Sequence, residues 1–177
     1  MANLPVPSPR TFVVGETETG AYFNSVRDGQ TYVLNRPLLR INQNTLQGLT
    51  SGTWTSISMD ATTVDSYGMH SNSSNNSRAT AINAGWYWPS GAVAFAASAT
   101  GTRGARFAVN GTAVPGTAQF LPPTASGSLA VAAVSIPLFL NAGDYVEIQG
   151  VQNSGGSLNT LIASDLDSTL GLIWVHA

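Results

Sequence analysis

The stretch from residue 83 to residue 111 constrains the fold more than any other part of the chain. Within it, positions 91–97 and 106–110 alternate between larger and smaller side chains, the period of two that is typical of β-strands. Turn-forming residues at 99–104 separate the two strands, and Asn110-Gly111 is the strongest short signal for a hairpin. We therefore predict a sheet-building segment, and we expect function to depend on the surface that this sheet supports.

The chain after Gly52 continues in the same way. The run 129–140 is almost continuously apolar and is broken by Pro137. We expect a buried strand with a bulge or turn at this proline, because proline lacks the amide hydrogen that a sheet requires. About eight short strands separated by turns predict an all-β protein, and an eight-stranded jelly-roll β-sandwich is the simplest fit. The other expected strands are 53–59, 118–121, 145–151, 157–163 and 170–177.

The first 45 residues have a different character. Three alternating prolines at 5–9 predict an extended beginning. Apolar residues spaced by three or four within 17–35 predict a short helix, although Gly29 weakens the pattern, and we expect 38–49 to be a connector. We therefore divide the chain into an N-terminal arm, residues 1–45, and a jelly-roll domain, residues 46–177. The arm is either a flexible tail or, as we favour, a docking segment that lies on a neighbouring protein.

Composition excludes several functions. Only 9% of residues are charged and the net charge is −2. All basic residues are arginines spread along the chain, so no basic stripe is present for nucleic acid. No apolar run is long enough to insert into a membrane, and no signal peptide is visible. The absence of cysteine excludes disulfides, a thiol nucleophile and a cysteine-based zinc site.

The sequence gives little support for catalysis. Asp65, His70 and Ser71 are the residue types of a nucleophilic triad, but they lie in a loop rich in glycine and asparagine without an oxyanion motif. The acids at 60, 65, 165 and 167 lack the spacing of a calcium-binding loop. We predict a protein that is not an enzyme and that has no cofactor and no metal site.

The polar loop before Ala79 is the candidate ligand site. Exposed loops on a rigid scaffold often bind partners, and this loop is a candidate for contact with a ligand such as carbohydrate or protein. The same residues also suit an unoccupied connection. The candidate contact residues are His70, Ser71, Asn75 and Arg78.

The order of several short motifs resembles the jelly rolls of the tumour-necrosis-factor and C1q-like superfamily. These motifs are an early Trp-x-x-Ile strand at 54–57, Gly-Trp-Tyr at 85–87, Leu-x-x-Gly-Asp-Tyr-Val-Glu at 140–147 and the terminal strand at 170–175. The resemblance implies a homotrimer whose interface contains aromatic side chains. Adjacent strand residues point to opposite faces, so we expect Trp86 or Trp88 at that interface, with other aromatic residues inside each sandwich.

A second resemblance concerns the arm. The segment from Pro9 to Asp28 is similar to the N-terminal segment of small structural proteins in phages of actinobacteria. This resemblance implies a virion protein, made in the host cytoplasm, whose arm docks on other virion proteins while the jelly roll projects outward. The docking residues that it implies are Phe12, Tyr22, Asn24, Arg27 and Asp28.

The sequence leaves two locations in the virion open. A tail-associated protein, in a minor-tail or fibre-tip position, would contribute to host contact, and its arm would attach to tail proteins. A capsid decoration protein would stabilise the shell, and its arm would attach to the major capsid protein. A secreted binding module is a third interpretation, which the lack of a signal peptide disfavours.

Overall fold

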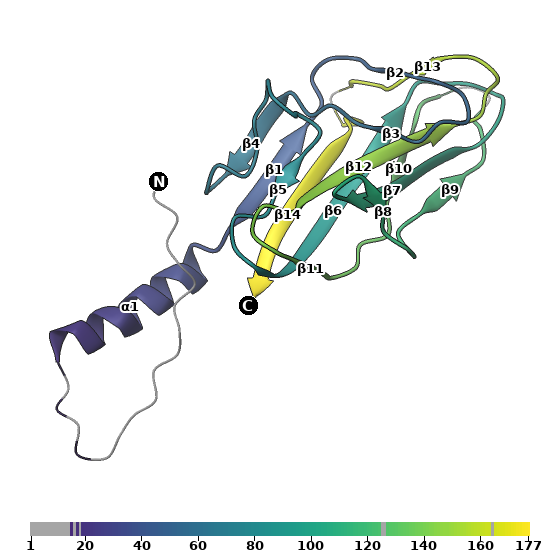
Figure 1. Cartoon of the computed structure of the whole chain (residues 1–177). Helices are drawn as coiled ribbons and strands as arrows, with labels where there is room; N and C mark the ends of the chain where they lie inside the picture. Colours follow the sequence, from purple (N-terminus) through teal and green to yellow (C-terminus); the bar gives the residue numbers. More distant parts are fainter. Residues whose placement is uncertain (1–14, 16, 18, 125–126, 164) are drawn as a thin grey trace.

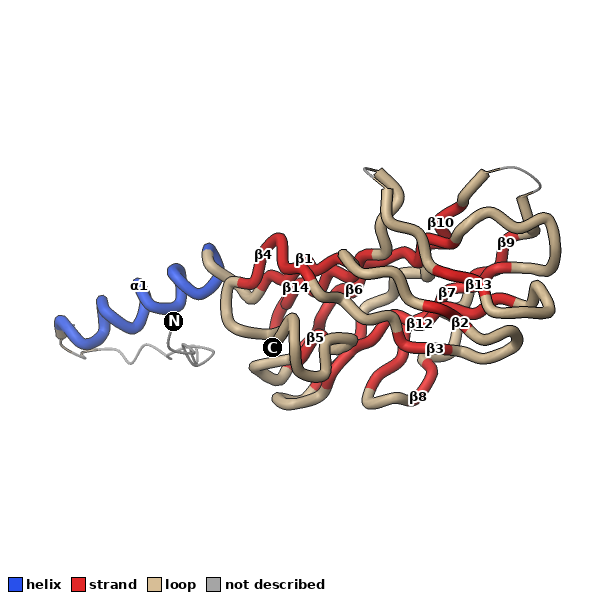
Figure 2. The backbone as a smooth tube through the Cα atoms, turned by 90° about the horizontal axis from the view of Figure 1, so that it is seen from above, coloured by secondary structure: helices blue, strands red, loops and turns tan. Residues whose placement is uncertain are grey.

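The computed structural model consists of one helix followed by a β-sandwich (Figure 1). The helix, α1 (Gly20–Leu34), extends away from the sheets, as two perpendicular views show (Figures 1 and 2). The structure describes residues 15, 17, 19–124, 127–163 and 165–177. Residues 1–14 and 16 of the extended segment predicted over 1–16 therefore lie outside the described residues.

The first sheet has six strands. Its central path runs β10-β6-β14-β1-β4, and β11 pairs with the other end of β6. Every pairing is antiparallel. The strands are β1 (Leu38–Asn42), β4 (Ala61–Asp65), β6 (Gly85–Phe95), β10 (Leu129–Ala132), β11 (Leu138–Leu140) and β14 (Thr169–His176).

The second sheet also has six strands, with the path β3-β12-β7-β8, while β5 pairs with β12 and β9 with β7. Its members are β3 (Thr55–Ser56), β5 (Ala79–Thr80), β7 (Arg103–Val109), β8 (Thr112–Ala113), β9 (Gln119–Leu121) and β12 (Tyr145–Gln152). A separate short pair joins β2 (Gly48–Leu49) to β13 (Leu158–Asn159). The sandwich confirms the predicted all-β class.

Strand β6 contains most of the alternating pattern predicted for residues 91–97 and extends it back to Gly85. Its odd positions from 85 to 89 are buried and its even positions are exposed, so Tyr87 enters the core while Trp86 and Trp88 face outward. Beyond Gly91 the same phase places Val93 and Phe95 in the core. Burial of each large apolar side chain stabilises the fold by about 1.5–3 kcal/mol.

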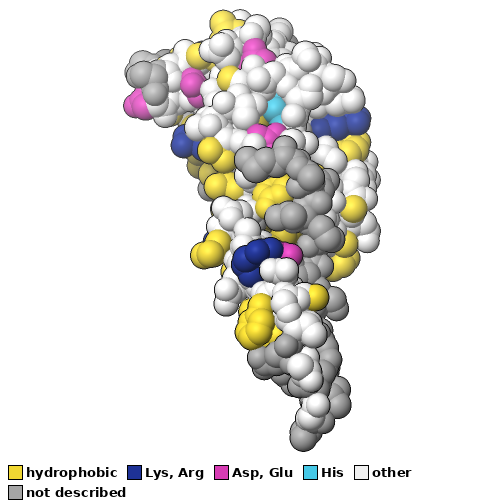
Figure 3. Space-filling view, turned by 90° about the vertical axis from the view of Figure 1, so that its left-hand side faces the viewer, with side chains coloured by type: hydrophobic (Ala, Val, Ile, Leu, Met, Phe, Trp, Pro, Cys, Tyr) yellow, Lys and Arg dark blue, Asp and Glu magenta, His cyan; other side chains and the backbone are white. Residues whose placement is uncertain are grey.

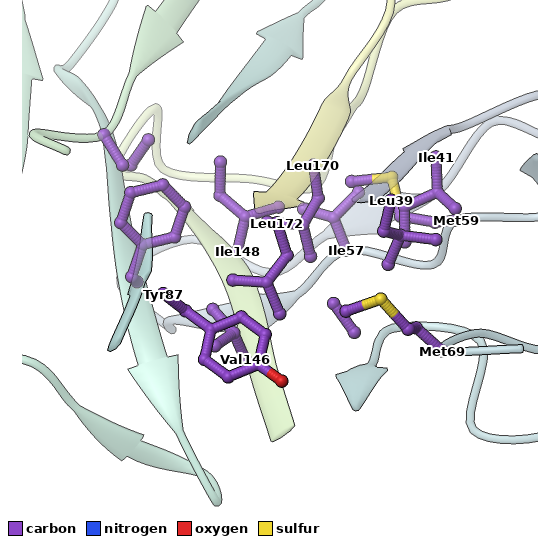
Figure 4. Close-up of a cluster of buried hydrophobic side chains, with 14 of the residues drawn as sticks. Leu39, Ile41, Ile57, Met59, Met69, Tyr87, Val146, Ile148, Leu170 and Leu172 are labelled. Carbon is purple, nitrogen blue, oxygen red and sulfur yellow. The ribbon is translucent and has the colours of Figure 1, made fainter. Parts of the chain in front are cut away.

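The core lies between the two sheets. Figure 4 shows side chains from β1, β6 and β14 of the first sheet together with Val146 and Ile148 from β12 of the second. Glycine allows a close approach between the sheets, because a Cβ on Gly150 of β12 would lie 3.0 Å from Cγ1 of Val93. The two layers are therefore packed tightly at this point.

The predicted hairpin at Asn110-Gly111 is confirmed. Both residues have positive φ, 51° for Asn110 and 78° for Gly111, as a two-residue type I′ turn requires. The turn places Val109 of β7 opposite Thr112 of β8. The run 129–140 is also divided near Pro137 as expected, but it forms two strands, β10 and β11, that pair with different parts of β6.

The predicted connector at 38–49 is wrong. Residues 38–42 form β1, which lies between β14 and β4 in the first sheet. Its alternate residues Leu39 and Ile41 are fully buried. The strand was missed because Pro37 and the short apolar run gave no turn signal of a hairpin; its partners are about 130 residues away or lie beyond a loop. The sandwich thus begins at Leu38, within the segment that the sequence assigned to the arm.

The predicted helix within 17–35 is confirmed as α1, which continues through Gly29. Its C-terminal end is attached to the sandwich by Tyr32, whose side chain is 1% exposed. The Tyr32 ring packs edge to face on Trp174 at 5.0 Å, and its hydroxyl accepts a hydrogen bond from Nδ2 of Asn83 at 2.7 Å. One buried aromatic contact therefore positions the helix.

A buried amide generates a stability prediction. Gln43 is 0% exposed, and neither Oε1 nor Nε2 has a hydrogen-bond partner among the described residues. An unpaired buried amide destabilises a fold by about 1–3 kcal/mol. Methionine has a similar volume to glutamine and no polar hydrogen, so we expect Gln43→Met to raise the free energy of unfolding by that amount in urea titrations.

The matched control is Gln152→Met, at a buried amide that is paired. This change is expected to lower the free energy of unfolding, because Nε2 of Gln152 donates to Leu49 O and Gly156 O. A Gln43→Met variant less stable than the wild type would show that the Gln43 amide does not destabilise the core.

Candidate functional site

The loop after β4 is organised by one carboxylate. Asp65 accepts hydrogen bonds from four successive backbone amides: Oδ1 from Tyr67, Gly68 and Met69, and Oδ2 from His70. Gly68 has a φ of +73°, which allows the backbone to turn so that these amides converge. Charge-assisted hydrogen bonds of this kind are stronger than neutral ones. The loop is therefore a defined structure.

His70 joins this loop to its surroundings. Nδ1 lies 2.9 Å from the carbonyl oxygen of Arg78, and Nε2 lies 3.0 Å from that of Met59. The ring therefore connects the two ends of the loop with the segment before β4. Because both ring nitrogens face carbonyl oxygens and the Asp65 carboxylate faces amides, Asp65, His70 and Ser71 do not form a proton relay.

All four predicted ligand-loop residues line one pocket of about 340 Å³. His70, Ser71, Asn75 and Arg78 are joined there by residues that the sequence pattern did not reveal, among them Gly143 and Tyr145 from the turn and strand that begin β12. The guanidinium carbon of Arg78 lies 4.1 Å from the centroid of the Tyr145 ring. This is a cation–π contact, and it fixes the position of the guanidinium. No sequence signal links Arg78 to Tyr145, since their contact depends on the pairing of β5 with β12.

The electrostatic surroundings of the pocket are simple. Among the described residues that line it, none is acidic, and Arg78 is its single arginine. The acids nearby in the sequence are engaged elsewhere: Glu147 accepts from the Ser77 hydroxyl, and Asp144 accepts from Nδ2 of Asn110 at 2.8 Å. The hydrogen bond from Asn110 and that from the amide of Asn141 lower the pKa of Asp144. The described residues contain no group of three or more His, Asp or Glu side chains placed to hold a metal ion.

A second candidate surface lies on the outer face of the first sheet. Trp86 is 39% exposed, Trp88 46% and Phe139 54%. Trp86 packs edge to face on Phe139 at 5.8 Å, and its ring lies 6.5 Å from that of His176. We call Trp86, Trp88, Phe139 and His176 the aromatic face. Both predicted interface tryptophans thus point away from the core of their own chain, whereas Phe139 and His176 join them through strand pairing that the sequence did not reveal.

The predicted docking residues that the structure describes all lie on α1. Asn24, Arg27 and Asp28 are exposed and Tyr22 is half-buried, and Arg27 forms an ion pair with Asp28 at 3.0 Å. Phe12 lies outside the described residues. Large apolar side chains are also exposed on this helix, including Phe23 at 57% and Val26 at 42%.

The general character of the surface agrees with the composition. On the face seen in Figure 3, charged side chains are few and scattered, and hydrophobic side chains are visible on the projecting helix as well as on the sandwich. Among the described residues, no helix is long and apolar enough to span a lipid bilayer.

Comparison with known proteins identifies the fold. The structure is similar to that of murine APRIL crystallised at pH 8.5, with a TM-score of 0.58 and 11% sequence identity over 79% of this chain and 99% of that chain. It is also similar to Eiger TNF from S. frugiperda, with a TM-score of 0.51 and 15% identity over 79% of this chain and 94% of that chain. No protein-family model matches the sequence, and no curated protein matches it. The β-domain is thus a jelly roll of the tumour-necrosis-factor type, and at these identities the likeness concerns the fold alone.

The role of Asp65 is testable by substitution. Asp65→Ala removes the acceptor that four backbone amides share, and we expect it to lower the free energy of unfolding by about 2–4 kcal/mol. Amide hydrogen exchange at residues 67–70 is expected to accelerate. Asp165→Ala is the matched control, because Asp165 is exposed, and its effect is expected to stay within about 0.5 kcal/mol. Equal effects of the two substitutions would show that Asp65 does not organise the loop.

Proposed function

We propose that this protein is a non-enzymatic structural component of a bacteriophage virion, associated with the tail, where it contributes to host contact. The helix α1 docks the protein on other virion proteins, and the jelly roll projects outward as a homotrimer. The observation that favours a contact role is the loop pocket, in which polar residues are held in place around one arginine. Reinforcement of a shell does not require such a pocket, whereas contact with a host ligand does.

The docking role of α1 is supported by its exposed surface. A helix in a single chain normally buries its apolar side chains, yet Phe23 and Val26, which lie one turn apart, are both exposed. The segment 9–28, which resembles the N-terminal segment of phage structural proteins, includes the first part of this helix, residues 20–28. Both observations favour a partner that covers α1 in the assembled particle.

The homotrimer is supported by the aromatic face. Aromatic residues are enriched in the cores of protein interfaces, and four rings on one side of a sheet form a patch of the kind that mostly marks an interaction site. The patch lies on β11, β6 and β14, three neighbouring strands at one edge of the first sheet. Other copies of the same chain would cover it.

Trimer formation gives the first prediction of this proposal. Trp88→Glu places a charge in the aromatic face, and burial of an unpaired charge is strongly unfavourable, so we expect monomers in place of trimers. Light scattering after gel filtration distinguishes the 18.4 kDa monomer from a trimer of three times that mass. Phe120→Glu is the matched control, because Phe120 is 55% exposed on β9 of the other sheet, and this variant is expected to remain trimeric. A monomeric wild-type protein, or a Trp88→Glu variant that stays trimeric, would overturn the assignment.

Docking gives the second prediction. We expect the double variant Phe23→Ser/Val26→Ser to fold and trimerise normally but to be depleted about tenfold or more from purified particles, because it loses the apolar contact surface of α1. The measurement is the amount of tagged variant in particles from infected cells that also make the wild-type protein. Leu46→Ser, at an apolar residue of the sandwich that is 55% exposed, serves as the control and is expected to incorporate normally. Normal incorporation of the double variant would exclude α1 as the docking element.

A further inference from the structure

We propose that the loop pocket binds a carboxylated sugar, such as a uronic acid unit of a surface polysaccharide, and that Arg78 binds its carboxylate. This inference deepens the host-contact role proposed above and rests on it for its biological meaning. The binding itself is a property of the isolated protein. It follows from three features of the pocket: a guanidinium and a set of hydroxyl and amide groups that have no partner among the described residues, and a rigid frame.

The guanidinium of Arg78 is available to a ligand. Among the described residues it has no ion-pair partner and no hydrogen-bond acceptor, and its one specific contact is the face of the Tyr145 ring. Stacking on an aromatic face leaves the N–H groups at the edge of the guanidinium directed outward. An arginine held in this way is suited to bidentate binding of a carboxylate, and the absence of acids from the described lining removes competition for it.

The rest of the lining suits a sugar ring. Ser74, Asn75 and Thr80 contribute hydroxyl or amide groups whose side chains have no hydrogen-bond partner among the described residues, so these groups can bind the hydroxyls of a ligand. The side-chain oxygen of Ser71 accepts a hydrogen bond from the amide of Ser74, and its own hydrogen has no acceptor among the described residues. A volume of about 340 Å³ lies at the lower end of the range for ligand pockets, which fits one sugar unit of a longer chain.

The frame of the pocket is preorganised on both sides. On one side, the amide of Arg78 donates to Asn75 O and that of Thr80 donates to Met69 O, which closes the loop that Asp65 and His70 already hold. On the other side, the amide of Gly143 donates to Ala81 O at 2.8 Å. Binding to such a site requires little ordering of the backbone, so more of the contact energy contributes to affinity.

The test is a titration of the whole protein, followed by NMR, with glucuronic acid as the probe. Glucose is the neutral match, and acetate supplies a carboxylate without a ring. We expect glucuronic acid to bind at least about tenfold more tightly than either, because one charge-assisted contact and several hydroxyl contacts act together. The shifted amide signals are expected at residues 68–80 and 143–145.

Two variants separate the parts of this inference. Arg78→Gln is expected to weaken glucuronic acid binding about tenfold or more and to leave the weak binding of glucose unchanged. Arg36→Gln makes the same change of charge at an exposed residue between α1 and β1, and it is expected to bind as the wild type does. Thermal melting checks that both variants are folded.

Three outcomes would overturn the proposal. Equal binding of glucose and glucuronic acid would remove the role of the carboxylate, and equal binding of acetate and glucuronic acid would reduce the pocket to a simple anion site. Unchanged binding by Arg78→Gln would exclude this arginine. None of these outcomes bears on incorporation into particles, so a failure here is distinguishable from a failure of the virion assignment.

Discussion

The antiparallel pairing of β6 with β14 is the constraint on which the rest of the structure depends. It runs from Trp86 to Ala92 and requires glycine at its closest points, because a Cβ on Gly91 would lie 2.6 Å from the carbonyl oxygen of Thr169. The pairing fixes which side chains of β6 enter the core and which form the aromatic face. It also brings Trp174 to the position where Tyr32 attaches the helix. The core, the candidate interface and the attachment point of the proposed docking helix thus share one pair of strands.

The pocket is formed mainly by loops and does not depend on the centre of a sheet. Asp65 converts a segment rich in glycine and serine into a fixed arrangement by collecting backbone amides. The pairing of β5 with β12 then brings Arg78 over Tyr145. In the proposed function, assembly depends on a sheet face and recognition on a loop, so each surface can vary without disturbing the core.

The sequence predicted what depends on local chemistry. Alternation identified the strands around Val93 and Phe107, and positive φ at Asn110-Gly111 followed from residue type. The four predicted ligand-loop residues line one pocket, and their role in binding stays a prediction. Strand β1 and the contribution of Tyr145 to the pocket were missed, because both depend on pairing with strands that lie far along the chain. The alternation of side chains within a strand does not show which strand is its partner. The aromatic face was predicted only in part. The outward positions of Trp86 and Trp88 follow from alternation, whereas the position of Phe139 depends on how β11 pairs with β6.

The proposed role in host contact is tested most directly by the location of the protein on intact particles, measured by electron microscopy with gold-labelled antibodies against the β-domain. We expect gold at the tail end, where an outward-facing pocket would meet a host surface. Gold spread over the head would contradict the contact role and indicate a decoration protein whose trimers stabilise the shell. Absence of gold from all particles would contradict the virion assignment itself.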